Sequence, residues 1–275
     1  MTVVTVLVAE AKIAPSSFFV KCGEMKIRFD QKKFWNMNYI EYKGKTICID
    51  KPGAHYGTVI KFPRIGFIGS GHTENEEEKI ISLDLKSDGE KINLRNLKDN
   101  AVLLGNKFTL IRKSRIKNIE IENHIEISLK TITETVKLRS DKKVQLSLMY
   151  NFMHPWNPLI KYMAKLVSGE IITGNSYETN KFYVEKETEW LAFYSDKLRI
   201  GVVSKLIKSY KKTKNISRVW DRNVYLKYYL MSFRMQEFPA NTAVVFKMIT
   251  KLFDAAPDKW HEKAKIIGTG RFQSY

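Results

Sequence analysis

Three clusters of side chains have types and spacing that suit acid–base chemistry on a hydroxylated ligand. The first lies in "GFIGSGHTE", where His72 and Glu74 project from the same side of an extended chain. A carboxylate beside an imidazole tunes it for proton transfer, so His72 is a candidate catalytic residue and Glu74 a ligand-binding one. His55, shortly upstream, is a further ligand-binding candidate. The alternative is a solvated acidic loop, since three more glutamates follow at once.

The second cluster ends the segment "LMYNFMHPW", residues 148–156. His154 and Trp156 continue the alternation of an apolar strand, and we expect pairing to end at Pro155, which has no N–H to donate. That places the two rings at the rim of a sheet. A Trp face suits the C–H surface of a sugar and His carries protons, so His154 is predicted as catalytic and Trp156 as ligand-binding. A buried, hydrogen-bonded histidine is the alternative.

The third cluster is "RVWDRNVYLKYYLMSF", residues 218–233. Alternation predicts one face of acid, amide, phenol and ammonium groups, and an opposite, largely apolar face for the core. Acid, amide, phenol and ammonium groups on one face can bind a hydroxylated, negatively charged sugar ring. The candidates are Tyr225 and Tyr229 as acid or base, with Asn223, Lys227 and, from the opposite face, Arg222 as ligand-binding residues. An ordinary exposed sheet face is the alternative.

Period-2 alternation dominates the rest of the chain and predicts the elements that must position these groups. In "NIEIENHIEISLKT" isoleucines share one parity while glutamates, with His124, share the other. That pattern is typical of a strand with one buried face. "YKGKT", "SDGEK" and "YSDKL" predict tight turns. About a dozen such runs, without βαβ alternation, predict an all-β protein: one large antiparallel β-sandwich domain over residues 1–275, with 1–15 as a loose N-terminal segment.

Helical signals are few. In "DAAPDKWHEKAKIIG", Asp254 can cap, Pro257 fits the first turn and Gly268 can end the helix, which predicts one short C-terminal helix. "PLIKYMAKLV", residues 158–167, is a possible second short helix.

Composition narrows the partners. A net charge of +18, mostly from lysine, suits an anionic partner, although lysine spread over a surface also serves solubility. The basic run over residues 205–218 predicts a mobile loop that could cover an anionic substrate, contact nucleic acid or simply be solvated, and the last is the default. No nucleic-acid recognition module is present, so nucleic acid is a disfavoured partner. Cys22 and Cys48 could pair, but both lie in apolar runs where free buried thiols are common. No metal-type cysteine spacing is present; His72 and Glu74 could ligate a metal, but two residues do not make a site. No cofactor is expected, and the short apolar N-terminus indicates neither a signal peptide nor a membrane span.

Four segments together resemble the galactose-mutarotase-like β-supersandwich: "EYKGKTICIDKPGAHYGTVI", "GSGHTE", "FMHPW" and "WDRNVYLKYYL". They span most of residues 35–230. This superfamily includes sugar epimerases, accessory domains of glycoside hydrolases and domains of polysaccharide lyases. The resemblance implies a carbohydrate-active protein. The two histidines and late carboxylate of the epimerases have no clear counterpart here beyond "NHIEI" around His124.

Lyases of this fold remove a proton next to a uronate carboxylate, using Tyr or His, while a cationic or amide group neutralises that carboxylate. By this resemblance the chain is predicted to act on an acidic, uronate-containing saccharide by β-elimination or epimerisation. A non-catalytic carbohydrate-binding sandwich is the first alternative, and a nucleic-acid binder the second.

Overall fold

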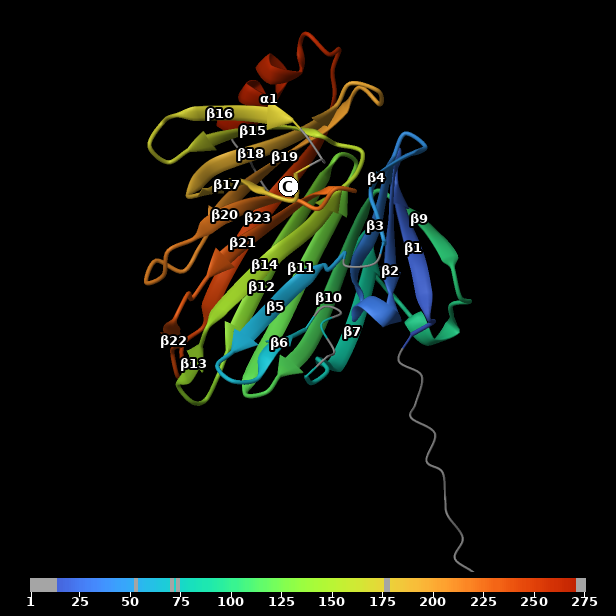
Figure 1. The fold of residues 1–275 in the computed structure, drawn as a ribbon. Coiled ribbons are helices and arrows are strands. Elements are labelled where there is room, and N and C mark those ends of the chain that lie inside the picture. Colours follow the sequence, from blue (N-terminus) through green and yellow to red (C-terminus); the bar gives the residue numbers. More distant parts are fainter. Residues whose placement is uncertain (1–13, 52–53, 70–71, 73–74, 176–178, 271–275) are drawn as a thin grey trace, which may run out of the picture.

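Two large β-sheets lie face to face in a computed structural model that describes residues 14–51, 54–69, 72, 75–175 and 179–270 (Figure 1). This confirms the predicted all-β sandwich. Pairing is antiparallel throughout the described sheets apart from the β1–β9 pair, which is parallel. Glu74 and most of the N-terminal segment lie outside the described residues.

The first sheet has eleven strands. They are β1 (Ser17–Cys22), β2 (Met25–Asp30), β3 (Asn36–Tyr42), β4 (Lys45–Cys48), β5 (Gly57–Phe62), β6 (Gly66–Ile68), β9 (Ala101–Gly105), β14 (Leu148–Trp156), β17 (Phe182–Lys186), β20 (Ile216–Asp221) and β21 (Leu226–Ser232). Their order is β17-β20-β21-β14-β4-β3-β2-β1-β9, and β5 also pairs with β14 and carries β6. Strand β14 therefore lies at a fork, with β4 beside its end and β5 beside its beginning.

The second sheet has ten strands in the order β16-β15-β18-β19-β23-β12-β11-β10-β7-β8. They are β7 (Lys79–Ser87), β8 (Glu90–Ile92), β10 (Lys107–Ile116), β11 (Ile119–Ser128), β12 (Thr131–Arg139), β15 (Lys161–Leu166), β16 (Ile171–Asn175), β18 (Thr188–Ser195), β19 (Ile200–Lys208) and β23 (Val244–Asp254). The smaller elements are a ribbon of β13 (Val144–Leu146) with β22 (Gln236–Phe238), two 3-10 turns, η1 (Gln31–Lys33) and η2 (Leu94–Asn96), and helix α1 (Trp260–Thr269).

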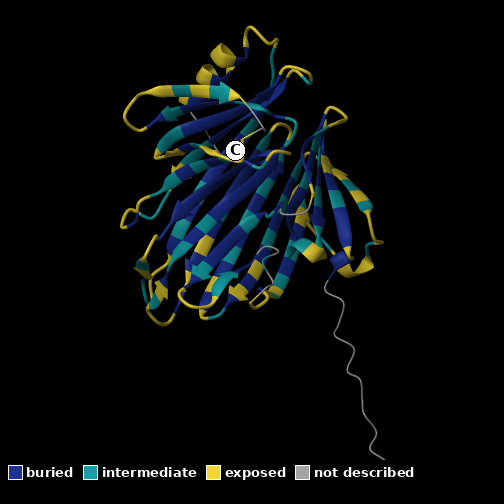
Figure 2. Cartoon of the chain, viewed as in Figure 1, coloured by how far each residue is buried: buried dark blue, intermediate teal, exposed yellow. Residues whose placement is uncertain are grey.

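The main core fills the space between the sheets, and the predicted alternation produces it. In β11 the isoleucines Ile119, Ile121, Ile125 and Ile127 are buried there, and Figure 2 shows this alternation of burial along the strands. The three predicted turns are present. In two of them the central residues have positive φ, as in Lys43–Gly44, the geometry that joins twisted strands in two residues.

The C-terminal helix exists but differs from its predicted bounds. It begins at Trp260, because Asp254 is the last residue of β23 and pairs with Lys43 instead of capping. Gly268 lies inside the helix rather than ending it: a Cβ there would come within 2.4 Å of the Trp190 ring. The helix packs on the outer face of the second sheet, where Trp260 stacks on Tyr194 with ring centroids 5.1 Å apart.

The second predicted helix, over residues 158–167, is wrong. Most of this segment is strand β15, paired with β16 and β18. Its alternate residues face opposite ways: Tyr162 and Ala164 enter the main core, while Met163 joins the cluster under α1. Because both faces of this strand are buried, its sequence is apolar nearly throughout. Periodicity cannot distinguish such a run from a buried helix.

A bulge in β14 decides which way its side chains face. The register with β21 shifts between Asn151 and His154, and Phe152 adopts a φ of 55°. Before the bulge Tyr150 faces outward, whereas after it His154 and Trp156 face the core between the sheets. The strand also continues through Pro155, contrary to the expected end of pairing, because the Pro155 carbonyl still accepts a hydrogen bond from Ile49.

Two polar contacts cross the interior. The Nε2 atom of His154 lies 2.7 Å from the carboxylate of Glu134 on β12, so the pair links the two sheets. Arg112 on β10 lies 3.2 Å from Glu78 and donates to the Phe34 carbonyl at 2.6 Å. Burial lowers the pKa of Arg112, and the Glu78 carboxylate supplies the counter-charge that a buried guanidinium needs.

We predict that His154→Ala lowers the free energy of unfolding by about 3–5 kcal/mol, because it leaves the Glu134 carboxylate buried without this partner. The matched control is His124→Ala, since His124 pairs with Glu122 at 3.1 Å on the solvated face of β11. That change should cost less than about 1 kcal/mol. Urea unfolding measures both, and equal losses would contradict a structural role for the interior pair.

Candidate functional site

A line of contacting rings and guanidinium groups crosses the outer face of the first sheet, which points away from the second sheet. We call it the aromatic row, and its members come from β5–β6, β14, β17 and the β20–β21 hairpin. They are His55, Phe67, His72, Tyr150, Phe182, Arg218, Trp220, Arg222 and Tyr229. Tyr229 belongs to a small apolar cluster separate from the main core, against which Phe67, Tyr150 and Trp220 pack.

The contacts in the first half of the row run from histidine to tyrosine. His55 stacks on His72 with ring centroids 3.8 Å apart, and His72 stacks on Phe67 at 5.2 Å. Phe67 contacts Tyr150 at 5.8 Å, and Tyr150 contacts Tyr229 at 4.5 Å. The rings therefore form a continuous surface, with Phe67 and Tyr150 half-buried and open on one side.

Arginines connect the second half of the row. The Arg218 guanidinium lies 4.2 Å from the centroid of the Phe182 ring and 5.8 Å from that of Tyr229. Phe182 stacks on Trp220 at 5.3 Å, and Arg222 lies 4.3 Å above the Trp220 ring. Cations over aromatic faces hold both partners in place, so this end of the row is ordered without a ligand.

The β20–β21 hairpin determines which residues share the row. Its turn, with Asn223 at a φ of 63°, places Trp220 directly opposite Lys227 and Arg218 opposite Tyr229. Unbroken alternation through residues 218–233 had assigned Trp220 to the core face, and that prediction is wrong. A turn at "DRNVY", signalled by its asparagine, would have grouped the residues correctly.

The phenols of the row are weak acids in this setting. Burial raises the pKa of Tyr229 well above its ordinary value, and the neighbouring Tyr150 adds to the shift, while Arg218 opposes it. Burial likewise raises the pKa of Tyr150, against a lowering by Arg218. Both phenols are therefore protonated at neutral pH, when they can donate a hydrogen bond or a proton but cannot accept one as phenolate.

Lys227 lies on the same face and is 6% exposed. Burial, with a smaller contribution from the Arg222 charge, lowers its pKa to about 7. No carboxylate in the described parts of the chain pairs with it. A cation withdrawn from water in this way is stabilised by any anion that reaches it.

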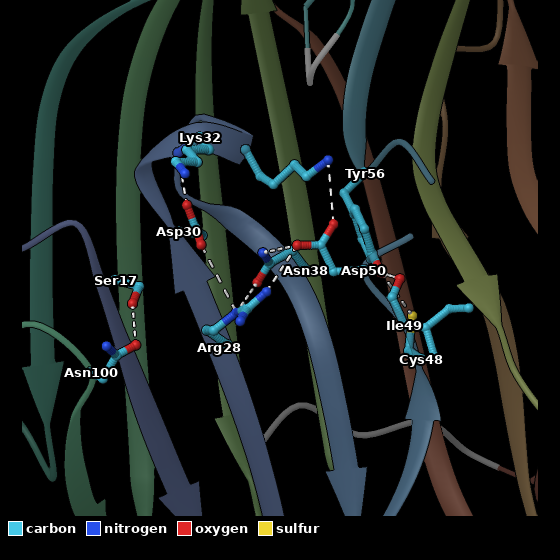
Figure 3. A network of polar contacts seen from close by, with 11 residues as sticks. Ser17, Arg28, Asp30, Lys32, Asn38, Cys48, Ile49, Asp50, Tyr56 and Asn100 are labelled. Carbon is cyan, nitrogen blue, oxygen red and sulfur yellow. Dashed lines mark hydrogen bonds and ion pairs between the residues drawn. The ribbon is translucent and has the colours of Figure 1, made fainter. Parts of the chain in front are cut away.

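The histidine end of the row is held by two local structures. Gly69 has a φ of 109° and bridges to His72, whose N–H donates to the Gly69 carbonyl at 2.9 Å. The loop that carries His55 starts at Asp50, whose carboxylate binds Arg28 at 2.9 Å and Lys33 at 3.3 Å (Figure 3).

Sequence reasoning missed this Arg28–Asp50 network, which Asn38 completes with a hydrogen bond from Arg28. It also missed Phe67, Phe182 and Arg218. The pairing of strands distant in the sequence creates these contacts, so alternation within one strand carries no signal for them.

The predicted site residues do not all meet. His55, His72, Tyr229 and Arg222 lie in the aromatic row, and Lys227 lies beside its Trp220 end. Of the others, Tyr225 is buried, with its pKa raised by burial, and Asn223 is exposed in the turn, where its side chain accepts a hydrogen bond from the Asn180 N–H.

His154 and Trp156 are 2% and 0% exposed in the main core, so they are remote from the row's open side. Strict alternation predicts that Tyr150 and His154, four residues apart, face the same side of the sheet. The bulge at Phe152 places them on opposite sides.

Both cysteines are free and buried. Within residues 14–270, leaving aside the short undescribed gaps, no three His, Cys, Asp or Glu side chains are grouped as metal ligands would be. In the same described residues no helix is long and apolar enough to cross a membrane.

Comparison of the sequence with family models gives no match, and comparison with curated proteins gives none either. Solved structures do match. A candidate aldose 1-epimerase from Escherichia coli is 8% identical, aligns over 87% of this chain and 99% of its own, and has a TM-score of 0.53. A protein from Synechocystis sp. PCC 6803 is 7% identical over 90% and 99%, with a TM-score of 0.55.

The galactosidase domain of an α-galactosidase–sucrose kinase is 8% identical over 88% of this chain but only 41% of its own, with a TM-score of 0.57. At such identities these likenesses define a fold and nothing finer. This chain has the galactose-mutarotase-like β-supersandwich fold, as its sequence predicted.

We predict that Lys227→Met raises the free energy of unfolding at pH 6 by about 1–4 kcal/mol, because it removes a buried charge that no carboxylate of the described residues balances. In the folded protein Lys227 loses its proton near pH 7, and in the unfolded chain near pH 10. The penalty is therefore complete below pH 7 and disappears as the pH rises toward 10.

Urea unfolding at pH 6 and pH 9 measures this difference, with Lys208→Met on exposed β19 as control. A gain from Lys227→Met that is the same at both pH values would contradict the buried charge.

Proposed function

We propose that this protein binds an acidic, uronate-containing saccharide along the aromatic row and acts on it by β-elimination or epimerisation. The observation that carries the proposal is the row itself, in which aromatic rings alternate with arginines and end beside a lysine. The fold is shared with structures described as a candidate aldose 1-epimerase and a galactosidase domain. Flat rings suit the C–H faces of sugars, and the cations suit a carboxylate.

The acid–base roles go to groups within the row. His72 is the proposed base, which removes the proton beside the uronate carboxylate. Phe67 and Tyr150 lie between His72 and Tyr229, so elimination requires both groups to reach the same sugar ring across these two side chains. Tyr229 is the proposed acid, because its raised pKa keeps the proton that a leaving glycosidic oxygen would take. Elimination then breaks the bond to that oxygen and leaves an unsaturated uronate. Epimerisation instead returns a proton to the opposite side of the same carbon.

A non-catalytic saccharide-binding protein is the second candidate. Burial of the phenols favours it, because a tyrosine whose pKa is raised gives up its proton less readily and is a weaker general acid. The row would then provide affinity alone. Nucleic acid fits less well, since many lysines of the second sheet's outer face pair with glutamates, as Lys113 does with Glu122 and Lys107 with Glu126.

We predict that Trp220→Ala weakens binding of a uronate oligosaccharide at least tenfold, about 1.4 kcal/mol, by removing a ring face at the centre of the cationic end. Trp220→Phe keeps a ring and should lose less. Isothermal titration calorimetry measures both affinities. Binding that is unchanged in Trp220→Ala would remove the aromatic row as the site.

We predict that Tyr229→Phe reduces the rate of formation of unsaturated uronate at least a hundredfold while binding changes little, if the phenol is the proton donor. Ultraviolet absorbance measures the elimination, and NMR of the product measures epimerisation. Tyr162→Phe, which alters a buried phenol of the second sheet, is the control. No turnover by the wild-type protein across a broad panel of uronate polymers, together with measurable binding, would favour the non-catalytic candidate.

A further inference from the structure

Lys227, on the outer face of the first sheet, differs from Arg112, a buried cation between the sheets. Arg112 has the Glu78 carboxylate at 3.2 Å and further acceptors around it. Lys227 is 6% exposed, yet among the described residues no acid and no hydrogen-bond acceptor contacts its ammonium group. When a buried charge has no partner in the protein, an anionic ligand can supply the opposite charge.

The described residues next to Lys227 on the neighbouring strands carry no acidic side chain. On β20 Trp220 lies directly opposite, and on β14 Pro155 does. Arg222, in the turn, lies 4.3 Å from the centroid of the Trp220 ring, and its charge acts on Lys227. Arg218 is the next charge along the row, and its charge is balanced by Glu185 of β17.

The acid closest in sequence faces elsewhere. Asp221 is 0% exposed and accepts hydrogen bonds from Thr179, Tyr183 and the Asn223 N–H. Counting the described residues alone, the net charge around Lys227 and Arg222 is therefore positive.

We infer that Lys227 and Arg222 form an anion subsite at the Trp220 end of the aromatic row, which takes one carboxylate or sulfate group of the ligand and takes up a proton as it fills. The inference rests on the proposed function and specifies where the acidic group of the saccharide binds. Arg222 supplies a permanent charge, while Lys227 supplies one that depends on pH.

The coupling to protons follows from the state of Lys227. Its lowered pKa leaves much of the free amine neutral above pH 7. A bound anion stabilises the ammonium form, so binding above pH 7 draws one proton from solution. Affinity should then fall by up to tenfold for each pH unit above 7, until the pH reaches the higher pKa of the complex.

The experiment is isothermal titration calorimetry at pH 7, 8 and 9, each in two buffers of different ionisation enthalpy. The probes are a glucuronate oligosaccharide, a sulfated neutral oligosaccharide, an unmodified neutral oligosaccharide and inorganic sulfate. The variants are Lys227→Met and, as control, Lys208→Met. We expect uptake approaching one proton per acidic ligand at pH 8, and loss of that uptake and of the pH dependence in Lys227→Met alone.

Each other outcome is decisive. Acidic and neutral saccharides bound equally, with no proton uptake, would overturn the subsite and leave the proposed function standing. If no saccharide binds, the proposed function fails. Independently of the proposed function, the titration with inorganic sulfate then tests the anion subsite. Sulfate that binds with proton uptake only when Lys227 is present supports it, and sulfate that binds neither wild type nor variant overturns it. Preference for carboxylate over sulfate identifies the natural anion.

Discussion

The left-handed backbone at Phe152 is the constraint on which both faces of the first sheet depend. One residue with a φ of 55° shifts the register of β14 against β21. As a result Tyr150 contributes to the outer row, while His154, four residues later, turns inward to meet Glu134. A bulge in a central strand re-aims the side chains that follow it. Here it separates a polar pair that joins the sheets from a ring surface that faces outward.

Buried charged groups on the two faces of the first sheet differ in whether they have a partner. Inside, Arg112 meets Glu78 and His154 meets Glu134, so each buried group has a partner. Outside, Lys227 is nearly as deeply placed and lacks one among the described residues. The ion pairs within the core stabilise the fold. An unpaired ammonium group beside the aromatic row lowers stability, and a bound anion would offset that cost.

Much of the architecture was predictable because strand alternation and turn chemistry are local. The isoleucines of β11 and the positive-φ turn at Lys43 follow from their own neighbours in the sequence. The candidate site was predictable only in part. His72 and Tyr229 were identified by type, but their grouping depends on the bulge at Phe152 and on the hairpin turn at Asn223. The row joins four separate parts of the sequence, and no single segment contains the information for that pairing.

The distribution of tryptophan has a practical consequence. Four of the five indoles, those of Trp35, Trp156, Trp190 and Trp260, are at most 3% exposed. Trp220 alone is half-buried, and it lies in the row beneath the Arg222 guanidinium. Collisional quenching by iodide should therefore act on one emitter out of five, with the nearby positive charges concentrating the quencher. Trp220 fluorescence would therefore report on contacts made with the aromatic row.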